Sequence, residues 1–265
     1  MNDAACHARG TDAFAPSLSP AAAPGLVGVL GGMGPLATLD FLHKVLAATP
    51  AQCDQDHVPM IVSSIPQVPD RTAAFRGEGE SPLPALRACG ERLAAAGAGL
   101  VVLPCNTAHL WFDALQSALG LPMLHLADAA LAELARRAPG ARVGLLATDA
   151  TLASGLYLNR PPLHPRPPHW VLPTAPEMLD WVMPGIAAVK AGAPEQGRRL
   201  LLQAAQALQR RGADALLLGC TELPLVLDEA ALGLPVIDAT DALARAVVAW
   251  SQAQRAAEPG AAVPA

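Results

Sequence analysis

The chain has 265 residues, of which 52% are hydrophobic and 3% aromatic, and its formal net charge at pH 7 is −5. This length suffices for two domains of ordinary size. The mild acidity, without a basic patch, argues against a nucleic-acid-binding protein and fits a soluble cytoplasmic one. Proline, glycine or charge interrupts every apolar run before it reaches the length of a membrane span. The five cysteines lack regular close spacing and therefore predict neither a disulfide framework nor a metal site.

The chain begins with an Ala/Pro/Ser-rich segment, residues 1–24, which is predicted to be a disordered tail, as is 258–265. A strand is predicted over 26–30 and a helix over 38–48. Between them lies a glycine turn, Gly31–Pro35, that lacks the spacing of a phosphate-binding motif. We expect its backbone N–H groups to approach a carboxylate instead.

A second strand, predicted over 58–65, leads into a loop that contains two prolines, 66–72. A stiff loop can hold Arg71 in one place, and its planar guanidinium matches a carboxylate in two-point contact. The alternative is a surface Arg71 that pairs with its neighbour Asp70. A proline-rich irregular loop is predicted over 160–169. Four further helices are predicted over 81–96, 107–119, 176–190 and 194–211. Two more are predicted to begin at 127 and at 240.

The segment Leu100–His109 reads Leu-Val-Val-Leu-Pro-Cys-Asn-Thr-Ala-His. Its apolar start predicts a short buried strand, and Asn106 and Thr107 are good N-caps for the helix that follows. Cys105 is therefore expected between the carboxyl end of a strand and the N-terminus of a helix. Backbone N–H groups at that place favour the thiolate and lower the pKa of a cysteine from its free value of about 8.5.

A second copy of this pattern occurs at Ala215–Pro224, which reads Ala-Leu-Leu-Leu-Gly-Cys-Thr-Glu-Leu-Pro and carries Cys220. Other segments repeat in the same order and at nearly the same offset. The repeated pairs are Leu26–Leu30 with Arg142–Leu146, Ala95–Ala98 with Arg210–Ala213, and Ala118–Pro122 with Ala231–Pro235. The chain is therefore predicted to consist of two related α/β halves, each with a cysteine at the end of the equivalent strand.

This arrangement favours proton-transfer chemistry. Ligands of open parallel sheets bind beyond the carboxyl ends of the strands, so two facing halves would put Cys105 and Cys220 on opposite sides of one cleft. One thiolate could then remove a proton from one face of a carbon while the opposite thiol protonates the other face. The alternative is a gene duplication that left two inert core cysteines.

At these residues the chain resembles the aspartate/glutamate racemase family, and more closely its aspartate racemase branch. The resemblance runs from about Leu26 to the final helix. The segments that carry it are Gly31–Pro35, Pro66–Thr72, Pro104–His109, Val189–Gly192 and Gly219–Glu222. Glutamate racemases tend to have an acidic residue where Met33 lies and a histidine where Glu222 lies.

The resemblance implies an α/β fold with two pseudo-symmetric domains, each a parallel sheet flanked by helices, in a PLP-independent and cofactor-free racemase that is usually dimeric. It implies Cys105 and Cys220 as the proton-transfer residues, and Arg71 and Lys190 as the residues that hold the side-chain carboxylate of the substrate. Further residues are expected to line the substrate pocket: Met33, Asn106, Thr107, Thr148, Thr151, Thr221 and Glu222. The last segment is expected to return to the first domain, which gives domains of 25–121 with 235–257, and of 122–234.

The sequence therefore predicts a racemase of aspartate or a related acidic amino acid, with a small-molecule substrate, a second copy of itself as partner, and no nucleic acid or membrane. One alternative is a non-catalytic ligand-binding protein on the same scaffold, although loss of a cysteine would be typical of that class. A cysteine-dependent isomerase or decarboxylase of a related diacid is another, although decarboxylation of this kind needs one cysteine. A thiol redox protein would usually carry a C-x-x-C motif, which this chain lacks.

Overall fold

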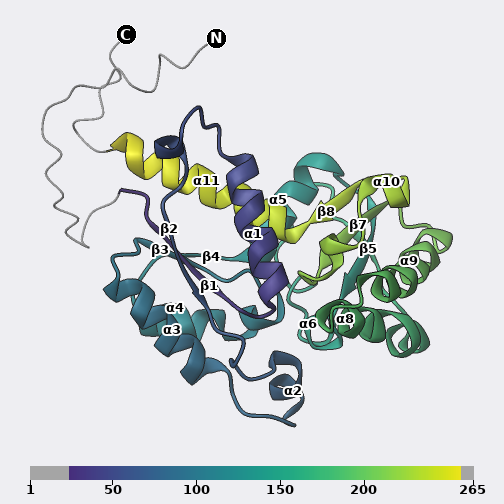
Figure 1. Ribbon diagram of the computed structural model, residues 1–265. Helices are drawn as coiled ribbons and strands as arrows, with labels where there is room; N and C mark the ends of the chain where they lie inside the picture. Colours follow the sequence, from purple (N-terminus) through teal and green to yellow (C-terminus); the bar gives the residue numbers. More distant parts are fainter. Residues whose placement is uncertain (1–23, 258–265) are drawn as a thin grey trace, which may run out of the picture.

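The computed structural model describes residues 24–257, and these contain two parallel four-stranded sheets (Figure 1). The strand order is β2-β1-β3-β4 in the first sheet and β6-β5-β7-β8 in the second, so the two sheets have the same topology. The predicted fold of two pseudo-symmetric α/β halves is confirmed. The strands are β1 Val27–Gly31, β2 Met60–Ser64, β3 Leu100–Val102, β4 Met123–Leu124, β5 Arg142–Ala147, β6 His169–Val171, β7 Ala215–Gly219 and β8 Val236–Asp238.

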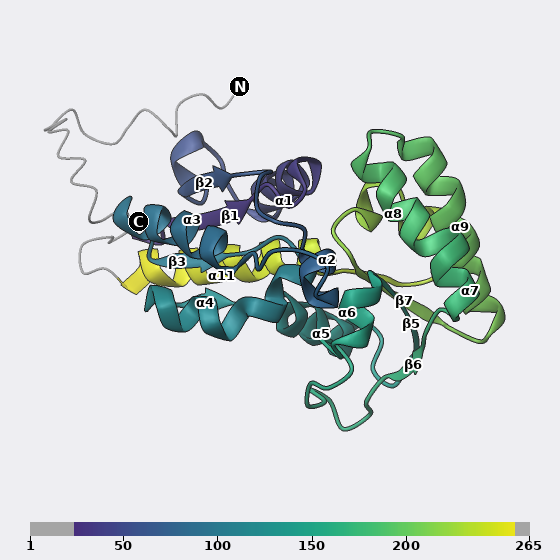
Figure 2. The ribbon, with the colours of Figure 1, turned by 90° about the horizontal axis from the view of Figure 1, so that it is seen from below.

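Helices flank both sheets (Figure 2). The α-helices are α1 Pro35–Ala48, α2 Arg71–Arg76, α3 Leu83–Ala95, α4 Phe112–Leu119, α5 Leu126–Arg137, α6 Asp149–Ala153, α7 Ala175–Glu177, α8 Met183–Lys190, α9 Pro194–Arg210, α10 Glu229–Leu232 and α11 Ala239–Ala257. Short 3-10 turns occur at η1 Asp54–Asp56, η2 Thr107–Trp111 and η4 Leu223–Leu225, and a π-helical turn, η3 Met178–Val182, joins α7 to α8. None of the helices within 24–257 is long and apolar enough to cross a membrane.

The apolar runs that predicted strands form the centre of each sheet. Strands β1, β3 and β7 are buried along their whole length, as is usual for parallel strands with helices on both faces. Helices α3 and α4 cover one face of the first sheet, and α8 and α9 cover one face of the second. The opposite faces share one core, in which Val29 of the first sheet and Leu217 of the second belong to the same cluster. The two halves are therefore joined by apolar packing.

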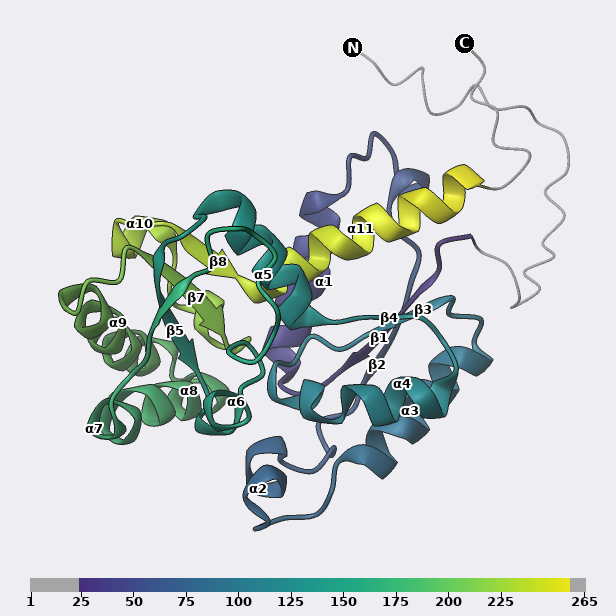
Figure 3. The same ribbon diagram turned by 180° about the vertical axis from the view of Figure 1, so that it is seen from behind.

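The strand pairing corrects both expected domain boundaries. Strand β4 pairs with β3 of the first sheet, and β8 pairs with β7 of the second. Boundaries at 121/122 and 234/235 would have assigned each of these strands to the wrong sheet. The repeated Gly-Leu-Pro turn before each strand returns the chain to the sheet that it has just left. Helix α11, which follows β8, packs against α1 and α5 (Figure 3).

One other local prediction is changed by the structure. Strand β6 lies at an edge of the second sheet, where the sequence predicted only an irregular loop followed by a helix. This strand has three residues, too few for an alternating pattern to be recognised. The predicted tails at 1–24 and 258–265 lie outside the described residues, apart from Pro24.

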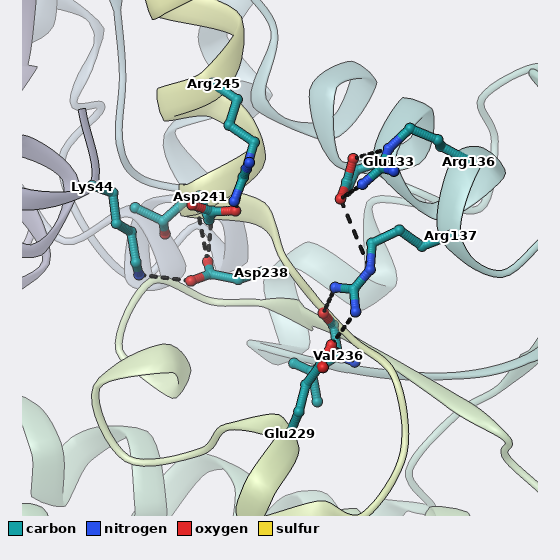
Figure 4. Close-up of polar contacts among 10 residues, drawn as sticks. Lys44, Glu133, Arg136, Arg137, Glu229, Val236, Asp238, Asp241 and Arg245 are labelled. Carbon is teal, nitrogen blue, oxygen red and sulfur yellow. Dashed lines mark hydrogen bonds and ion pairs between the residues drawn. The ribbon is translucent and has the colours of Figure 1, made fainter. Parts of the chain in front are cut away.

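An ion cluster connects α1 with the end of β8 (Figure 4). The ammonium of Lys44 lies 2.6 Å from Oδ2 of Asp238 and also contacts Asp40. The other oxygen of Asp238 accepts hydrogen bonds from the backbone N–H groups of Thr240 (2.8 Å) and Asp241 (3.2 Å), which begin α11. Burial lowers the pKa of Lys44, but the neighbouring carboxylates outweigh this effect and raise it. The cluster therefore ties a helix of the first half to the second half.

We expect the substitution Lys44→Met to lower the free energy of unfolding by about 2–4 kcal/mol, because it leaves the carboxylate of Asp238 largely buried without its cation. Arg245→Met is the matched control. Arg245 pairs with Asp241 within α11, where both side chains are more exposed, and such surface pairs contribute at most about 1 kcal/mol. Urea unfolding of both variants measures the difference. Equal losses would show that the buried pair has no special importance.

Candidate active site

The two cysteines lie at the carboxyl ends of equivalent strands. Cys105 follows β3 after Leu103 and Pro104, and its N–H donates to the carbonyl of Leu103 (2.8 Å). Cys220 follows the last residue of β7 directly. Their side chains are 6% and 5% exposed, respectively. The predicted helix after Cys105 begins as the 3-10 turn η2 and continues as α4.

One small pocket is lined by both cysteines and receives residues from both halves of the chain. Every predicted site residue except Thr151 lines it, and Asp70 and Thr72 were not predicted as site residues. The full lining is Met33, Asp70, Arg71, Thr72, Cys105, Asn106, Thr107, Thr148, Lys190, Cys220, Thr221 and Glu222. Within residues 24–257, no group of three or more His, Cys, Asp or Glu side chains is arranged to hold a metal ion.

Three threonines join the halves at the edge of this pocket. Oγ1 of Thr107, at the start of η2, lies 3.0 Å from Oγ1 of Thr148 and 3.1 Å from Oγ1 of Thr151. Thr148 also caps α6 by accepting a hydrogen bond from the N–H of Thr151 (3.2 Å). Thr151 therefore supports the pocket threonines and does not line the pocket itself.

Asn106 does not have the capping role predicted for it. Its backbone is already helical (φ −60°, ψ −54°), and its side chain makes no capping hydrogen bond. Its Oδ1 accepts a hydrogen bond from the hydroxyl of Tyr157, a buried residue that no sequence motif indicated. Its Nδ2 is buried and has no partner among residues 24–257. Because buried amide groups are normally paired, this N–H group is available to a ligand oxygen.

Arg71 is buried, with 8% of its surface exposed, and begins α2. Nη1 donates to the carbonyls of Val68 and Pro69 at 3.1 Å, and Nη2 donates to the carbonyl of Met33 at 3.5 Å. Nε is buried without a partner among the described residues. The alternative of a surface pair with Asp70 is wrong, because the described part of the chain places no carboxylate within 4.0 Å of the Arg71 nitrogens.

Asp70 serves as the N-cap of α2, and its Oδ1 accepts a hydrogen bond from the N–H of Ala73 (2.8 Å). Burial raises the pKa of this carboxyl, but the hydrogen bond from Ala73 and the charges of Lys190 and Arg71 outweigh burial and lower it. Asp70 is therefore an anion at neutral pH.

Lys190 ends α8 and is exposed beside the pocket. Partial loss of water around the ammonium lowers the pKa of Lys190. Negative charge on Glu222, Cys220 and Cys105 outweighs this effect and raises the pKa. Lys190 therefore remains protonated and stabilises negative charge on either thiol.

Cys220 is held in the protonated form. Its thiol donates to Oε2 of Glu222 (3.0 Å), a carboxyl that is only 4% exposed. Burial and the negative charge of Glu222 raise the pKa of Cys220 well above its ordinary value, although Lys190 acts in the opposite direction. No α-helix begins beside this thiol, because only the three-residue turn η4 follows Cys220.

His109 supports the turn that carries Cys105, a role that the sequence did not indicate. Its Nε2 accepts a hydrogen bond from the N–H of Leu126 (3.1 Å), so the ring proton is on Nδ1 and is donated to the carbonyl of Cys105 (2.8 Å). The ring is 4% exposed and stacks on Phe112. Burial lowers the pKa of His109 from 6.5 to about 4, so the imidazole is neutral at pH 7.

The neutral state of His109 predicts a loss of stability in acid. Between pH 6.5 and about 4 this histidine binds a proton in the unfolded chain but not in the folded one, so stability falls as the pH falls through that window. The pKa difference corresponds to about 3 kcal/mol at most. His109→Asn retains a donor for the Cys105 carbonyl and removes the titration. We expect urea unfolding of this variant to show a flatter pH dependence; identical pH slopes would contradict the assignment.

The fold and the pocket together define a two-domain α/β enzyme with one thiol from each half and two cations beside them. The model of the Asp/Glu/Hydantoin racemase family matches residues 30–247, so the chain belongs to that family. The racemases of this family are PLP-independent isomerases, and this is the enzyme class of the protein. The predicted resemblance is confirmed.

Two relatives resemble the chain over most of its length. The aspartate racemase of Picrophilus torridus superimposes with a TM-score of 0.76 at 33% identity and covers 86% of this chain and 94% of its own. The broad specificity amino-acid racemase RacX of Bacillus subtilis is 29% identical over 235 residues, which are 84% of this chain and 96% of RacX. The glutamate racemase of Aquifex pyrophilus shares the fold, with a TM-score of 0.55 at 19% identity over 84% of this chain and 82% of its own.

Proposed function

We propose that the protein is a cofactor-independent racemase of aspartate or a related acidic amino acid, and that Cys105 and Cys220 transfer the α-proton. The observation that carries this proposal is the single pocket lined by one thiol from each half. Cys220 is the proton donor in this proposal, because its thiol donates to Glu222 and its pKa is raised. The similarity to an aspartate racemase over most of both chains supports the choice of substrate class.

In the proposed reaction, the Cys105 thiolate removes the α-proton, and the electron pair of the broken C–H bond passes into the α-carboxylate. The thiol of Cys220 then gives its proton to the opposite face of the α-carbon, which forms the new C–H bond. In the reverse direction the two residues exchange roles. The thiols are nearly excluded from water, which strengthens every electrostatic interaction around the developing carbanion.

The remaining predicted residues bind the two carboxylates of the substrate in this proposal. The guanidinium of Arg71 and the ammonium of Lys190 hold the side-chain carboxylate, since both are cations beside the thiols. The free amide N–H of Asn106 and the hydroxyls of Thr107, Thr148 and Thr221 donate to the α-carboxylate, where charge develops. Met33 and Glu222 complete the wall, and Thr151 positions the threonines.

Proton NMR in D2O tests the proposal. Purified protein without added cofactor is incubated with L- and D-aspartate, L- and D-glutamate and L-alanine, and the α-proton signals are followed with time. We expect the signal of both enantiomers of an acidic amino acid to disappear as deuterium replaces the α-proton. Absence of exchange with all of them would overturn the proposal and favour a ligand-binding protein on the same scaffold.

The predictions of a cytoplasmic homodimer accompany this proposal. Helix α1 offers surface for a second copy, since Leu39 is 61% exposed and Leu46 is 46% exposed on one side of the helix. Large exposed leucines that share a helix face are typical of contact surfaces.

A further inference from the structure

A second and larger cavity adjoins the small pocket that both cysteines line, which we call the thiol pocket. The second cavity has a volume of about 450 Å³, and Asp70, Arg71, Lys190 and Glu222 line both spaces. Beyond these four residues its wall is mainly apolar and includes Leu36 and Ala37 from α1, Pro66 and Val68 from the loop before α2, Val189 from α8 and Leu225 from η4. We call this cavity the annex.

An aspartate substrate would fill only part of the annex. The thiol pocket itself has a volume of about 10 Å³, so the side chain of any substrate must extend into the annex. The side chain of aspartate is one methylene and one carboxylate, and Arg71 and Lys190 lie where the two spaces join, so this carboxylate is bound at the start of the annex. The annex extends past these cations along a wall that offers aliphatic side chains. The accessible apolar surface of this wall comes mainly from Leu36, which is 54% exposed, and from the half-buried Leu225, whereas Val68 and Val189 are only 3% and 2% exposed.

The charges at the junction favour a neutral chain in the annex. The junction is the place where the annex meets the thiol pocket. Two cationic side chains, Arg71 and Lys190, and two carboxyls, those of Asp70 and Glu222, line it together, so the cations there are accompanied by acidic groups. A carboxylate pushed beyond the junction would lose its hydration without gaining a cation of its own. An aliphatic chain in the same place would leave water and gain about 0.8 kcal/mol for each buried CH₂, which corresponds to about fourfold in binding per CH₂.

We propose that the annex receives the side chain of a neutral aliphatic amino acid, so that the enzyme racemises amino acids of the leucine and methionine class in addition to an acidic substrate. The inference rests on the proposed two-cysteine racemase function and adds a second substrate class to the same site. The α-carbon lies between the thiols as before, and the side chain passes between Lys190 and Arg71 into the annex. Leu225, which is half-buried on the annex wall, is then a specificity-determining residue.

The substitution Leu225→Trp tests this inference, because an indole at that position fills part of the annex. In the D2O assay, we expect the wild-type protein to exchange the α-protons of leucine and methionine as well as aspartate. We expect Leu225→Trp to lower kcat/KM for leucine and methionine by at least about tenfold, and to change kcat/KM for aspartate and alanine by less than about threefold. The control is Leu179→Trp, which places the same indole on a side chain that is 75% exposed and lines neither the annex nor the thiol pocket.

The outcomes separate this inference from the function on which it rests. Exchange of aspartate without exchange of leucine or methionine by the wild-type protein would overturn the annex proposal and leave the racemase proposal intact. Equal losses for aspartate and leucine in Leu225→Trp, in a variant whose melting temperature matches that of the wild-type protein, would also overturn it. Absence of exchange with every amino acid would overturn both proposals.

Discussion

Replacement of either pocket cysteine by serine is expected to lower the rate of racemisation by about 10³-fold or more, because a hydroxyl cannot act as a general base near neutral pH. Each single variant retains one thiol. We therefore expect Cys105→Ser and Cys220→Ser each to exchange the α-proton of one enantiomer only, the one whose proton faces the remaining cysteine. Proton NMR of D- and L-aspartate in D2O measures this directly.

The raised pKa of Cys220 adds an asymmetry to this prediction. In the Cys105→Ser variant the only remaining base is Cys220, whose proton is held by burial and by the carboxyl of Glu222. Its one-sided exchange is expected to increase with pH, since deprotonation of Cys220 supplies the base. Cys89→Ser is the matched control, because Cys89 is a buried free cysteine outside the pocket. Exchange of both enantiomers by either pocket variant would contradict the two-base mechanism.

The repeated architecture was predictable from the sequence because buried parallel strands leave a clear pattern. The continuous apolar runs of β1 and β5, and of β3 and β7, match in order and offset, and these strands form the centres of the two sheets. The pairing of β4 and β8 was not predictable. Each has only two or three residues, so its sheet is decided by the direction of the preceding turn and by tertiary packing.

The composition of the pocket was predictable to the extent that its residues follow strand ends, since parallel strands bring these positions to one edge. The roles of Tyr157 and His109 were not predictable. Tyr157 acts through a hydrogen bond to Asn106, which tertiary folding brings near. His109 acts through a hydrogen bond to the Cys105 carbonyl, which the shape of the turn brings near. The protonation of Cys220 was not predictable for a similar reason. It depends on the side-chain position of Glu222, which sequence spacing alone does not determine.

Arg71 provides the second large effect. It is a buried guanidinium without a carboxylate in contact among residues 24–257, and its Nε is unpaired, so an anionic substrate completes its interactions. We expect Arg71→Lys to lower kcat/KM for aspartate by about 10²-fold, because an ammonium retains the charge but cannot make the two-point contact. Arg71→Met is expected to lose about 10³-fold, in line with the cost of removing one partner of a buried charge pair.

Alanine distinguishes the role of Arg71 in substrate binding from a role in folding, because alanine has the α-carboxylate of aspartate but no side-chain carboxylate. If Arg71 holds the side-chain carboxylate, Arg71→Lys should change kcat/KM for alanine by less than about threefold while that for aspartate falls. Equal losses for the two substrates would mean instead that Arg71 binds the α-carboxylate or mainly fixes the carbonyls of Val68, Pro69 and Met33. Thermal unfolding separates these two cases, since only loss of the carbonyl contacts should lower the melting temperature in the absence of substrate.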